Sequence, residues 1–316
     1  MKHCPLCNSD KIKPNVGINN SFGQKNAISF CNSCELYFFS DMPSHCELNK
    51  FYSQTYFDEL SIDNIQYKLK SYFSEIRAKS QLAYISSFLA KSTPASVIEC
   101  GSADGTFLNL FKRQNWQIKG FELSETMRSN AIKKFNIKLD ASNFLDFKPA
   151  KKVGVIAFPH VLEHLIEPAE YLRHAARNLS EDGLIFLEFP YSPNPSEVDN
   201  TTLNNYFGTT HLYDFTEKST KRLVLESGLE LIDITRFKYP TPLCNKKTER
   251  LIGDALLTGD VSKLNSKELV LLCLSLAKMV ASKNSKKGAF NKVDIGDEWR
   301  GRGDNIRVLA KIASNY

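Results

Sequence analysis

The sequence predicts an α/β fold with a mostly parallel sheet at its centre and one addition near each end. Three observations support this prediction. Apolar runs typical of buried strands alternate with helix-like segments between Val97 and Phe237. Two C-x-x-C pairs lie near the N-terminus, and a leucine-rich stretch precedes the last apolar run. With 316 residues, 42% of them apolar, the chain can bury one substantial core and carry one or two appendages.

The N-terminal cysteines predict a structural zinc site. The two C-x-x-C pairs are formed by Cys4, Cys7, Cys31 and Cys34. The first residues lack the apolar core of a signal peptide, and without secretion this spacing favours a metal over disulfides. Two such pairs complete the tetrahedral thiolate set of Zn²⁺ and leave no open position, which excludes a catalytic role for this metal. Glycines between the pairs suit a hairpin, so residues 1–48 are predicted to form a zinc ribbon.

Residues 49–93 are predicted to form a helical linker. Apolar residues recur at roughly helical spacing from about Ile65 to Ala90, and Pro94 ends the pattern. Core packing is the simplest role for these side chains.

The stretch VIECGSADGTFL, from Val97 to Leu108, predicts a short strand, a turn of small residues and the start of a helix. The strand carries an acidic residue, Glu99. The turn contains Gly101, Ser102 and Gly105. Glycines there let the backbone approach a ligand closely. Ala103 replaces the middle glycine of the dinucleotide fingerprint, so a pyrophosphate site is disfavoured and a nucleoside cofactor is expected. A purely structural turn is the alternative.

A second apolar strand, Gln117 to Phe121, ends at Glu122, whose carboxylate can accept hydrogen bonds from both hydroxyls of a ribose. With Glu99 before the turn, this arrangement resembles the class I S-adenosylmethionine-dependent methyltransferases. The resemblance extends from Val97 to about Phe237. It implies a Rossmann-like, doubly wound sheet with an antiparallel edge strand, S-adenosylmethionine as cofactor and methyl transfer as the activity.

The resemblance also implies a set of cofactor contacts. Asn143 stands where the family usually carries an aspartate that contacts adenine, and an amide can still meet the adenine amino group. Helices before the first strand cap the cofactor in that family, which makes Tyr52 and Tyr56 candidate lining residues. The predicted cofactor-binding residues are Glu99, Gly101, Ser102, Gly105, Glu122, Leu123, Asn143, Phe144, Pro159 and His160.

The block PHVLEHL, which follows the apolar run VGVIAF, fits two interpretations. It contains H-x-x-E-H, a metalloprotease signature in which His160 and His164 would bind zinc from one helical face, with Glu163 as the base. However, it lies at the carboxyl end of a predicted strand, where ligands bind in open α/β sheets. It also resembles the fourth methyltransferase motif, and this interpretation is favoured. In the methyltransferase interpretation, His160 would face the methyl donor or the acceptor. Glu163 and His164 would either brace the site and its neighbouring loops or take part in the reaction.

The remaining core elements follow in order. A helix is expected from about Glu167 to Leu179, then a turn at Glu181–Gly183 and a strand from Leu184 to Phe189. A capped helix and a strand, Glu217 to Ser227 and Leu229 to Phe237, complete residues 94–240, the predicted methyltransferase core.

His211 lies in a segment that resembles a motif near the mouth of the family's site. A sulfonium-bound methyl group is already activated, so its transfer requires mainly alignment and desolvation, and a general base adds to the rate for a hydroxyl or acidic carbon acceptor. The candidate catalytic residues are His160 and His211. A histidine that serves only the loop structure is the alternative for His211.

The C-terminal part predicts a helical insertion at residues 241–290, which is a candidate homodimer surface. Its apolar run from Leu269 to Val280 is too short to span a bilayer. Residues 291–316 are predicted to supply the final strand of the core, paired with Leu229 to Phe237.

Composition restricts the partners. No apolar run is long enough for a membrane span, so a cytoplasmic protein without membrane association is expected. The net charge of +6 is mild and the lysines are scattered, which disfavours nucleic acid. A zinc ribbon beside such a core also occurs in C-methyltransferases of deoxysugars, so the expected acceptor is a sugar, a nucleotide-sugar or another biosynthetic intermediate. RNA or protein methylation with the ribbon as docking module, and a zinc metalloprotease, are the alternatives.

Overall fold

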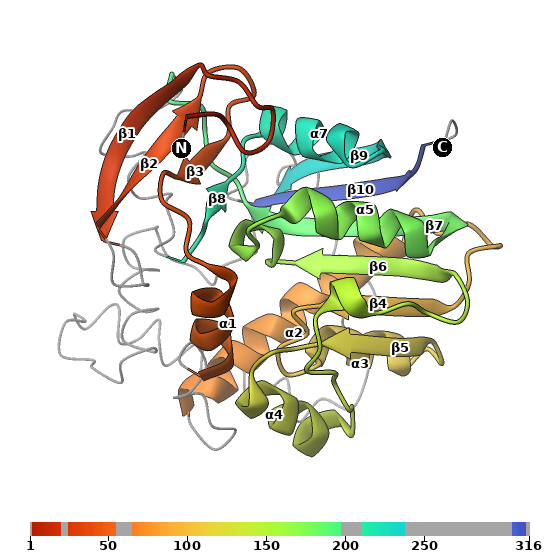
Figure 1. The fold of residues 1–316 in the computed structure, drawn as a ribbon. Coiled ribbons are helices and arrows are strands. Elements are labelled where there is room, and N and C mark those ends of the chain that lie inside the picture. Colours follow the sequence, from red (N-terminus) through yellow and green to blue (C-terminus); the bar gives the residue numbers. More distant parts are fainter. Residues whose placement is uncertain (1, 20–24, 55–64, 197–209, 238–304, 314–316) are drawn as a thin grey trace, which may run out of the picture.

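Two sheets organise the residues that the computed structural model describes, which are 2–19, 25–54, 65–196, 210–237 and 305–313 (Figure 1). The larger sheet has six strands, in spatial order β5 (Gln117–Phe121), β4 (Ser96–Cys100), β6 (Val153–Pro159), β7 (Leu179–Pro190), β10 (Asn305–Ile312) and β9 (Leu229–Phe237). The smaller sheet has four, in the order β1 (Ile12–Asn19), β2 (Lys25–Cys31), β3 (Tyr37–Phe39) and β8 (Tyr213–Asp214).

The larger sheet is parallel except at one side. β4 pairs in parallel with β5 and β6, and β6 pairs in parallel with β7. β10 is antiparallel to both of its neighbours, β7 and β9. The predicted Rossmann-like sheet with an antiparallel addition is therefore confirmed. The final strand pairs with β9 as expected, but it is inserted between β7 and β9, so β9 is the edge strand.

Helices cover both faces of this sheet. The helices on one face are α2 (Ile65–Ser86), α3 (Thr106–Lys112) and α4 (Glu125–Phe135), and those on the other are α5 (Pro168–Asn178) and α7 (Glu217–Glu226). Figure 1 shows α5 in front of the sheet and α2 behind it. Along β6, Ile156 packs in the core under α5, whereas Val155 and Ala157 pack in the core under α2. Burial on both faces explains why this strand is apolar at every position.

Local capping signals set two of the helix starts. The Ser124 side chain accepts a hydrogen bond from the Met127 backbone N–H at 3.3 Å, which begins α4. Thr216 and Ser219 form a reciprocal capping box at the start of α7. Helix α7 begins where the sequence predicts.

The prediction of a turn at Glu181–Gly183 is wrong, because β7 runs without interruption from Leu179 to Pro190. Val153 of β6 pairs with Leu179, but Val155 pairs with Leu184, so β7 advances five residues while β6 advances two. The surplus residues form an irregularity in the strand, where Glu181 and Asp182 are exposed. Polar residues and a glycine therefore mark a bulge here and not a chain reversal.

The N-terminal segment does not form its sheet alone. Strand β3 pairs with β8, which comes from the core far along the sequence. The Phe39 backbone N–H donates to the Leu212 carbonyl at 3.0 Å, and the Tyr37 hydroxyl donates to the Pro193 carbonyl at 2.8 Å. Phe38 is buried in a hydrophobic cluster that includes residues of the large sheet. The predicted ribbon and the core thus share packing and a strand.

Helix α1 (His45–Gln54) follows the ribbon, and α2 matches most of the helical pattern predicted from about Ile65 to Ala90. Among the helices in the described ranges, none combines the length and apolar character that a membrane span requires. The predicted insertion at residues 241–290 and the candidate lining residue Tyr56 lie outside the described residues.

Candidate active site

The turn that follows β4 brings the backbone close to the segment that follows β6. Gly101 and Gly105 have φ angles of +66° and +75°, left-handed conformations that favour glycine. A Cβ atom at Gly101 would lie 2.5 Å from Cγ2 of Val161, so a side chain fits there only if Val161 moves. The carboxyl ends of β4 and β6 therefore meet at one edge of the sheet, where open α/β folds bind ligands.

Glu122, at the end of β5, is buried and fixed by two backbone donors. Its Oε2 accepts a hydrogen bond from the Ala103 N–H at 2.8 Å, and its Oε1 accepts one from the Ser124 N–H at 2.8 Å. Burial raises the pKa of Glu122, although these backbone bonds act in the opposite direction. Each carboxylate oxygen keeps a second lone pair. The carboxylate is thus held beside the turn and can still accept hydrogen bonds from a ligand.

Glu99 is a second buried carboxyl group at this turn. It is 3% exposed, and within the described residues its Oε2 has no hydrogen-bond partner. Burial raises the pKa of Glu99 well above its ordinary value. Ser102 stabilises the turn, because its hydroxyl donates to the Glu99 carbonyl at 3.0 Å. The structure therefore brings together five of the predicted cofactor-binding residues, which are Glu99, Gly101, Ser102, Gly105 and Glu122.

The predicted adenine contacts have structural tasks of their own. Asn143 caps the 3₁₀ helix η1 (Phe144–Asp146), and its side-chain oxygen accepts hydrogen bonds from the Leu145 N–H and the Tyr171 hydroxyl, both at 3.0 Å. The Phe144 ring is buried among other aromatic rings of the core. The Leu123 carbonyl accepts a hydrogen bond from the Arg128 guanidinium at 2.6 Å. The Phe144 carbonyl accepts a hydrogen bond from the Phe147 N–H at 3.1 Å. Within the described residues, the side-chain nitrogen of Asn143 and the N–H of Phe144 are therefore the groups left for a ligand.

The segment after Pro159 is a tight turn. His160 has a φ of +55°, and its backbone N–H donates to the Glu188 carbonyl at 2.6 Å. The helix that follows, η2 (Leu162–His164), is a 3₁₀ helix of three residues. The H-x-x-E-H protease interpretation needs both histidines on one face of an α-helix, and this segment does not form one. The left-handed conformation of His160 and its hydrogen bond to Glu188 of β7 prevent His160 from joining the helix that contains His164.

The two predicted catalytic histidines lie around one buried carboxylate, Glu163. His160 Nδ1 is 3.5 Å from Glu163 Oε1, and His164 Nε2 is 3.9 Å from the same oxygen. The rings of His164 and His211 make an edge contact with centroids 4.9 Å apart. His160 and His211 therefore belong to one cluster, although they come from segments far apart in the sequence.

Charges within the cluster set its protonation. Burial acts to raise the pKa of Glu163, but the neighbouring histidines outweigh it and hold that pKa below its ordinary value. Burial acts to lower the pKa of His160 and His211, but carboxylate partners raise both values. For His164, burial prevails and lowers the pKa. The cluster thus combines an anionic centre, a neutral imidazole and two imidazoles that hold protons more tightly.

The sequence analysis missed the ion pair behind this cluster. Arg307 Nε lies 2.6 Å from Glu188 Oε2, and both side chains are at most 1% exposed. Glu188 also accepts a hydrogen bond from Gln81 Nε2 at 2.9 Å, and His160 Nε2 lies 3.0 Å from its Oε1. The sequence did contain a signal for this ion pair. Glu188 interrupts the apolar run of β7, and Arg307 interrupts the last apolar run.

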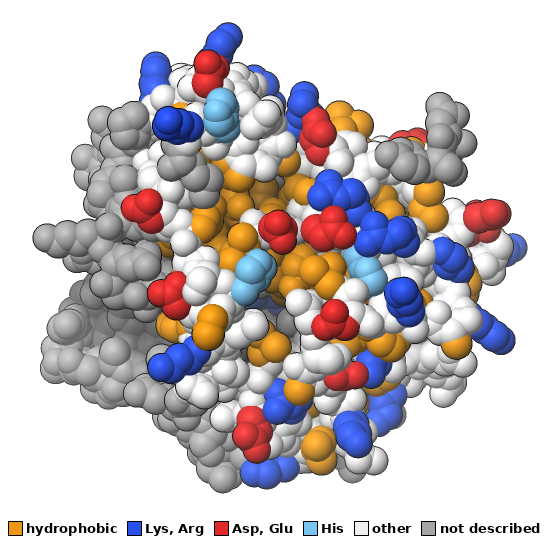
Figure 2. All heavy atoms as spheres, viewed as in Figure 1, with side chains coloured by type: hydrophobic (Ala, Val, Ile, Leu, Met, Phe, Trp, Pro, Cys, Tyr) orange, Lys and Arg blue, Asp and Glu red, His pale blue; other side chains and the backbone are white. Residues whose placement is uncertain are grey.

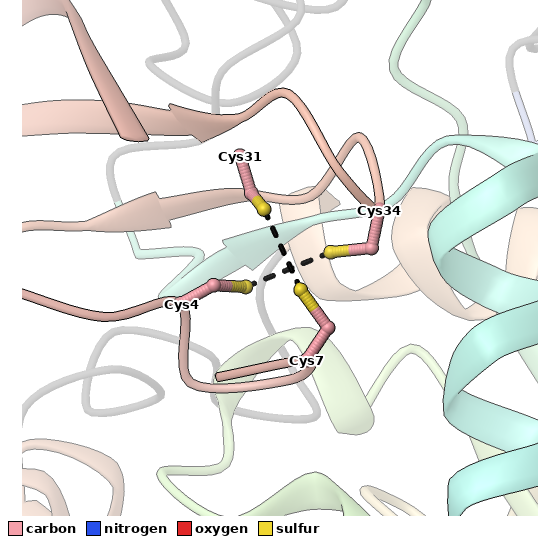
Figure 3. A group of neighbouring side chains, drawn as sticks. All are labelled: Cys4, Cys7, Cys31 and Cys34. Atoms are coloured by element: carbon pink, nitrogen blue, oxygen red, sulfur yellow. Dashed lines mark hydrogen bonds between the residues drawn. The ribbon is translucent and has the colours of Figure 1, made fainter. Parts of the chain in front are cut away.

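The four predicted zinc ligands converge on one point (Figure 3). The sulfur atoms of Cys4 and Cys34 are 3.6 Å apart, as are those of Cys7 and Cys31. Zinc–sulfur bonds of about 2.3 Å in a tetrahedron place sulfur atoms about 3.8 Å apart. The thiols are therefore arranged as a tetrahedral metal site requires.

The comparison with protein families decides between the interpretations of the core. A family model described as a methyltransferase domain matches residues 72–234, more than half of the chain. The chain belongs to this family. The methyltransferase match includes the turn after β4, Glu122 and the Glu163 cluster, and it confirms the resemblance that the sequence motifs predicted.

Solved structures similar to this methyltransferase share little sequence with it. A SAM-dependent methyltransferase from Archaeoglobus fulgidus is 18% identical, with a TM-score of 0.45, and the match covers 75% of this chain and 94% of that one. The plantazolicin methyltransferase BpumL in complex with SAH is 16% identical, with a TM-score of 0.48 and coverages of 84% and 94%. Magnesium protoporphyrin IX methyltransferase from Synechocystis PCC 6803 is 15% identical, with a TM-score of 0.45 and coverages of 61% and 91%. The curated proteins contain no match to the sequence.

Proposed function

We propose that this methyltransferase transfers the methyl group of S-adenosylmethionine to a small hydroxylated acceptor, such as a sugar, a nucleotide-sugar or another biosynthetic intermediate. The observation that supports the cofactor most directly is the pair of buried carboxyl groups at the turn after β4. Glu122 is held with lone pairs available for the ribose hydroxyls, and Glu99 has an oxygen without a donor, which suits a nearby amine. S-adenosylmethionine supplies an activated sulfonium methyl group when it is bound.

The residues of this chain would position the acceptor and remove its proton. His160 directly follows the end of β6, and His211 packs against His164 in the same cluster, so both can exchange a proton in mostly buried surroundings. Glu188 orients His160, and Asp214, 3.1 Å from His211 Nδ1, orients His211. We assign these two histidines as the candidate general bases.

Two observations favour a small acceptor over RNA. Figure 2 shows apolar side chains at the centre of one face, with lysines and arginines scattered around them and not gathered in a stripe. Nucleic-acid binding requires a continuous basic surface. In addition, β8 pairs with the free side of β3, so this edge of the ribbon is already occupied by the core. The ribbon therefore has a structural role in this proposal, with Zn²⁺ bound by Cys4, Cys7, Cys31 and Cys34.

The test is the affinity for S-adenosylmethionine, measured by titration calorimetry. Glu122→Ala and Glu122→Gln should weaken binding by roughly 10- to 100-fold or more, because each hydrogen bond to a charged group contributes about 1.5–3 kcal/mol. Glu181→Gln, an exposed change on β7, serves as the matched control and should bind as the wild type does.

Thermal unfolding of the same variants shows whether each protein is folded, since Glu122 also holds two backbone N–H groups. Unchanged cofactor affinity in a folded Glu122→Gln variant would contradict the proposed site.

A further inference from the structure

Glu163, His164 and His211 form a second cluster with the composition of a metal site. One ligand atom from each lies within 4.8 Å of the others. The first two residues belong to η2, and His211 comes just before β8. The Leu212 backbone N–H donates to the Glu163 carbonyl at 2.8 Å, which ties the two segments together. The cluster is therefore built into the fold and is not a chance meeting of surface side chains.

Glu163 lacks the partners that a buried carboxylate needs. It is 1% exposed, and within the described part of the chain neither of its oxygens has a hydrogen-bond partner. The nearest ring nitrogens, at 3.5 Å on His160 and 3.9 Å on His164, are too distant for good hydrogen bonds. Burial of a carboxylate without such bonds is costly unless a cation is close. The neighbouring histidines compensate the charge of Glu163, but they leave its oxygens without direct contacts, which a cation bound between Glu163, His164 and His211 would supply.

Both histidines have one ring nitrogen fixed by oxygen atoms. His164 Nδ1 lies 3.1 Å from the Thr210 carbonyl and 2.8 Å from the Tyr52 hydroxyl. His211 Nδ1 lies 3.1 Å from the carboxylate of Asp214, which is itself buried. A carbonyl or carboxylate oxygen only accepts, so Nδ1 carries the proton in each ring. The lone pair of each neutral imidazole is then on Nε2.

This arrangement is characteristic of metal-binding histidines, whose second nitrogen donates to a carboxylate, a carbonyl or water. Two imidazoles and one carboxylate supply three ligands, which leaves positions open for water or a substrate oxygen. The four cysteines differ in this respect, because together they would fill every coordination position of a tetrahedral ion. Imidazole ligands favour first-row transition metals over Mg²⁺ and Ca²⁺.

We propose that Glu163, His164 and His211 bind one divalent transition-metal ion through a carboxylate oxygen and the two Nε2 atoms, with open positions for an oxygen ligand. Metal–ligand bonds of about 2 Å place ligand atoms roughly 3.4 Å apart, so the three side chains move closer on binding. Val161, two residues before Glu163, lies against Gly101, which connects the segment of this cluster to the turn that is expected to hold the cofactor. With the ion bound, Nε2 of His211 is a ligand, so His160 alone remains as the candidate general base. A role of the ion in holding an acceptor oxygen rests on the proposed function, whereas the binding of the ion does not.

The test counts metal ions on the full-length protein. With the cysteine site filled, titration of Zn²⁺ or Co²⁺ should reveal one further ion per chain, and bound Co²⁺ should lack the intense thiolate absorption of a cysteine site. Glu163→Gln and His211→Ala should lose this ion, and Asp214→Asn should weaken it by about 10- to 100-fold. His45→Ala, an exposed histidine on α1, is the control and should bind both ions.

Thermal unfolding keeps the test valid if a variant is unstable. Added metal should raise the melting temperature of the wild type, whereas the Glu163→Gln variant should lose this stabilisation. Absence of a second ion, or wild-type metal affinity in a folded Glu163→Gln, overturns the proposal. The H-x-x-E-H protease interpretation makes His160 a ligand, whereas the proposed site does not use it. Loss of the ion in a folded His160→Ala variant would therefore also overturn the proposal. Cofactor titration of the wild type is a separate measurement, and its failure would contradict the proposed function without affecting the metal site.

Discussion

Replacing Arg307 with alanine is expected to lower the free energy of unfolding by about 3–5 kcal/mol, the usual cost of removing one partner from a buried ion pair. Arg307 Nε is 2.6 Å from Glu188 Oε2, and both side chains are at most 1% exposed. The guanidinium also donates to the Ser80 hydroxyl at 2.9 Å and lies over the Phe237 ring, 3.9 Å from its centroid. Its removal leaves Glu188 charged in a buried position. Urea unfolding measures the change.

The same strand offers a matched control. Lys311, also on β10, forms an ion pair of 3.3 Å with Glu230 of β9, and both side chains are more than a third exposed. Lys311→Ala should therefore cost no more than about 1 kcal/mol. Replacing Glu188 and Arg307 together by methionine should recover part of the loss, because no buried charge then lacks its counter-ion. Equal losses in the free energy of unfolding for Arg307→Ala and Lys311→Ala would show that burial does not determine how much the Glu188–Arg307 pair contributes to stability.

Replacing Cys31 with serine should abolish binding of the proposed structural zinc and destabilise the whole N-terminal sheet. A structural Zn²⁺ contributes about 10–16 kcal/mol to the folding of small zinc modules, which lack a sufficient core of their own. Because β3 pairs with β8 and packs against the core, the loss should also lower the melting temperature of the rest of the protein. Hydrogen exchange in β1 to β3 and the metal content measure the two effects.

Cys46→Ser provides the comparison, because Cys46 is an exposed cysteine on α1 outside the cluster. It should keep the zinc and the protection from exchange of the wild type. If Cys31→Ser retains both as well, the four thiols do not form a metal site.

The features predicted correctly from the sequence depend on residues close together along the chain. Strand β5 and the start of α7 were predicted at their observed positions, because an apolar run ends at Glu122 and a capping residue precedes Glu217. The spacing of the cysteine pairs likewise led to the cluster that the structure contains. The turn after β4 was recognisable because its glycines are required by local backbone geometry.

The features that were missed depend on residues distant in sequence. Nothing near Glu188 indicates that its partner is Arg307, because the two meet only when β10 is inserted beside β7. Glu163 was expected to brace the site or react, and its position at the centre of three histidines follows from the packing of η2 against the segment before β8. The bulge in β7 was mistaken for a turn, since acidic residues and a glycine suit both.

The pairing of β3 with β8 has a consequence for the order in which the protein assembles on the ribosome. The N-terminal sheet emerges first, but the strand that completes it is made only after β4 to β7 have left the ribosome. Until then β3 presents an open edge of Tyr37, Phe38 and Phe39, a segment suited to association with other nascent chains. Early capture of a metal ion by the cysteines would hold the unfinished sheet in shape while the core is being synthesised.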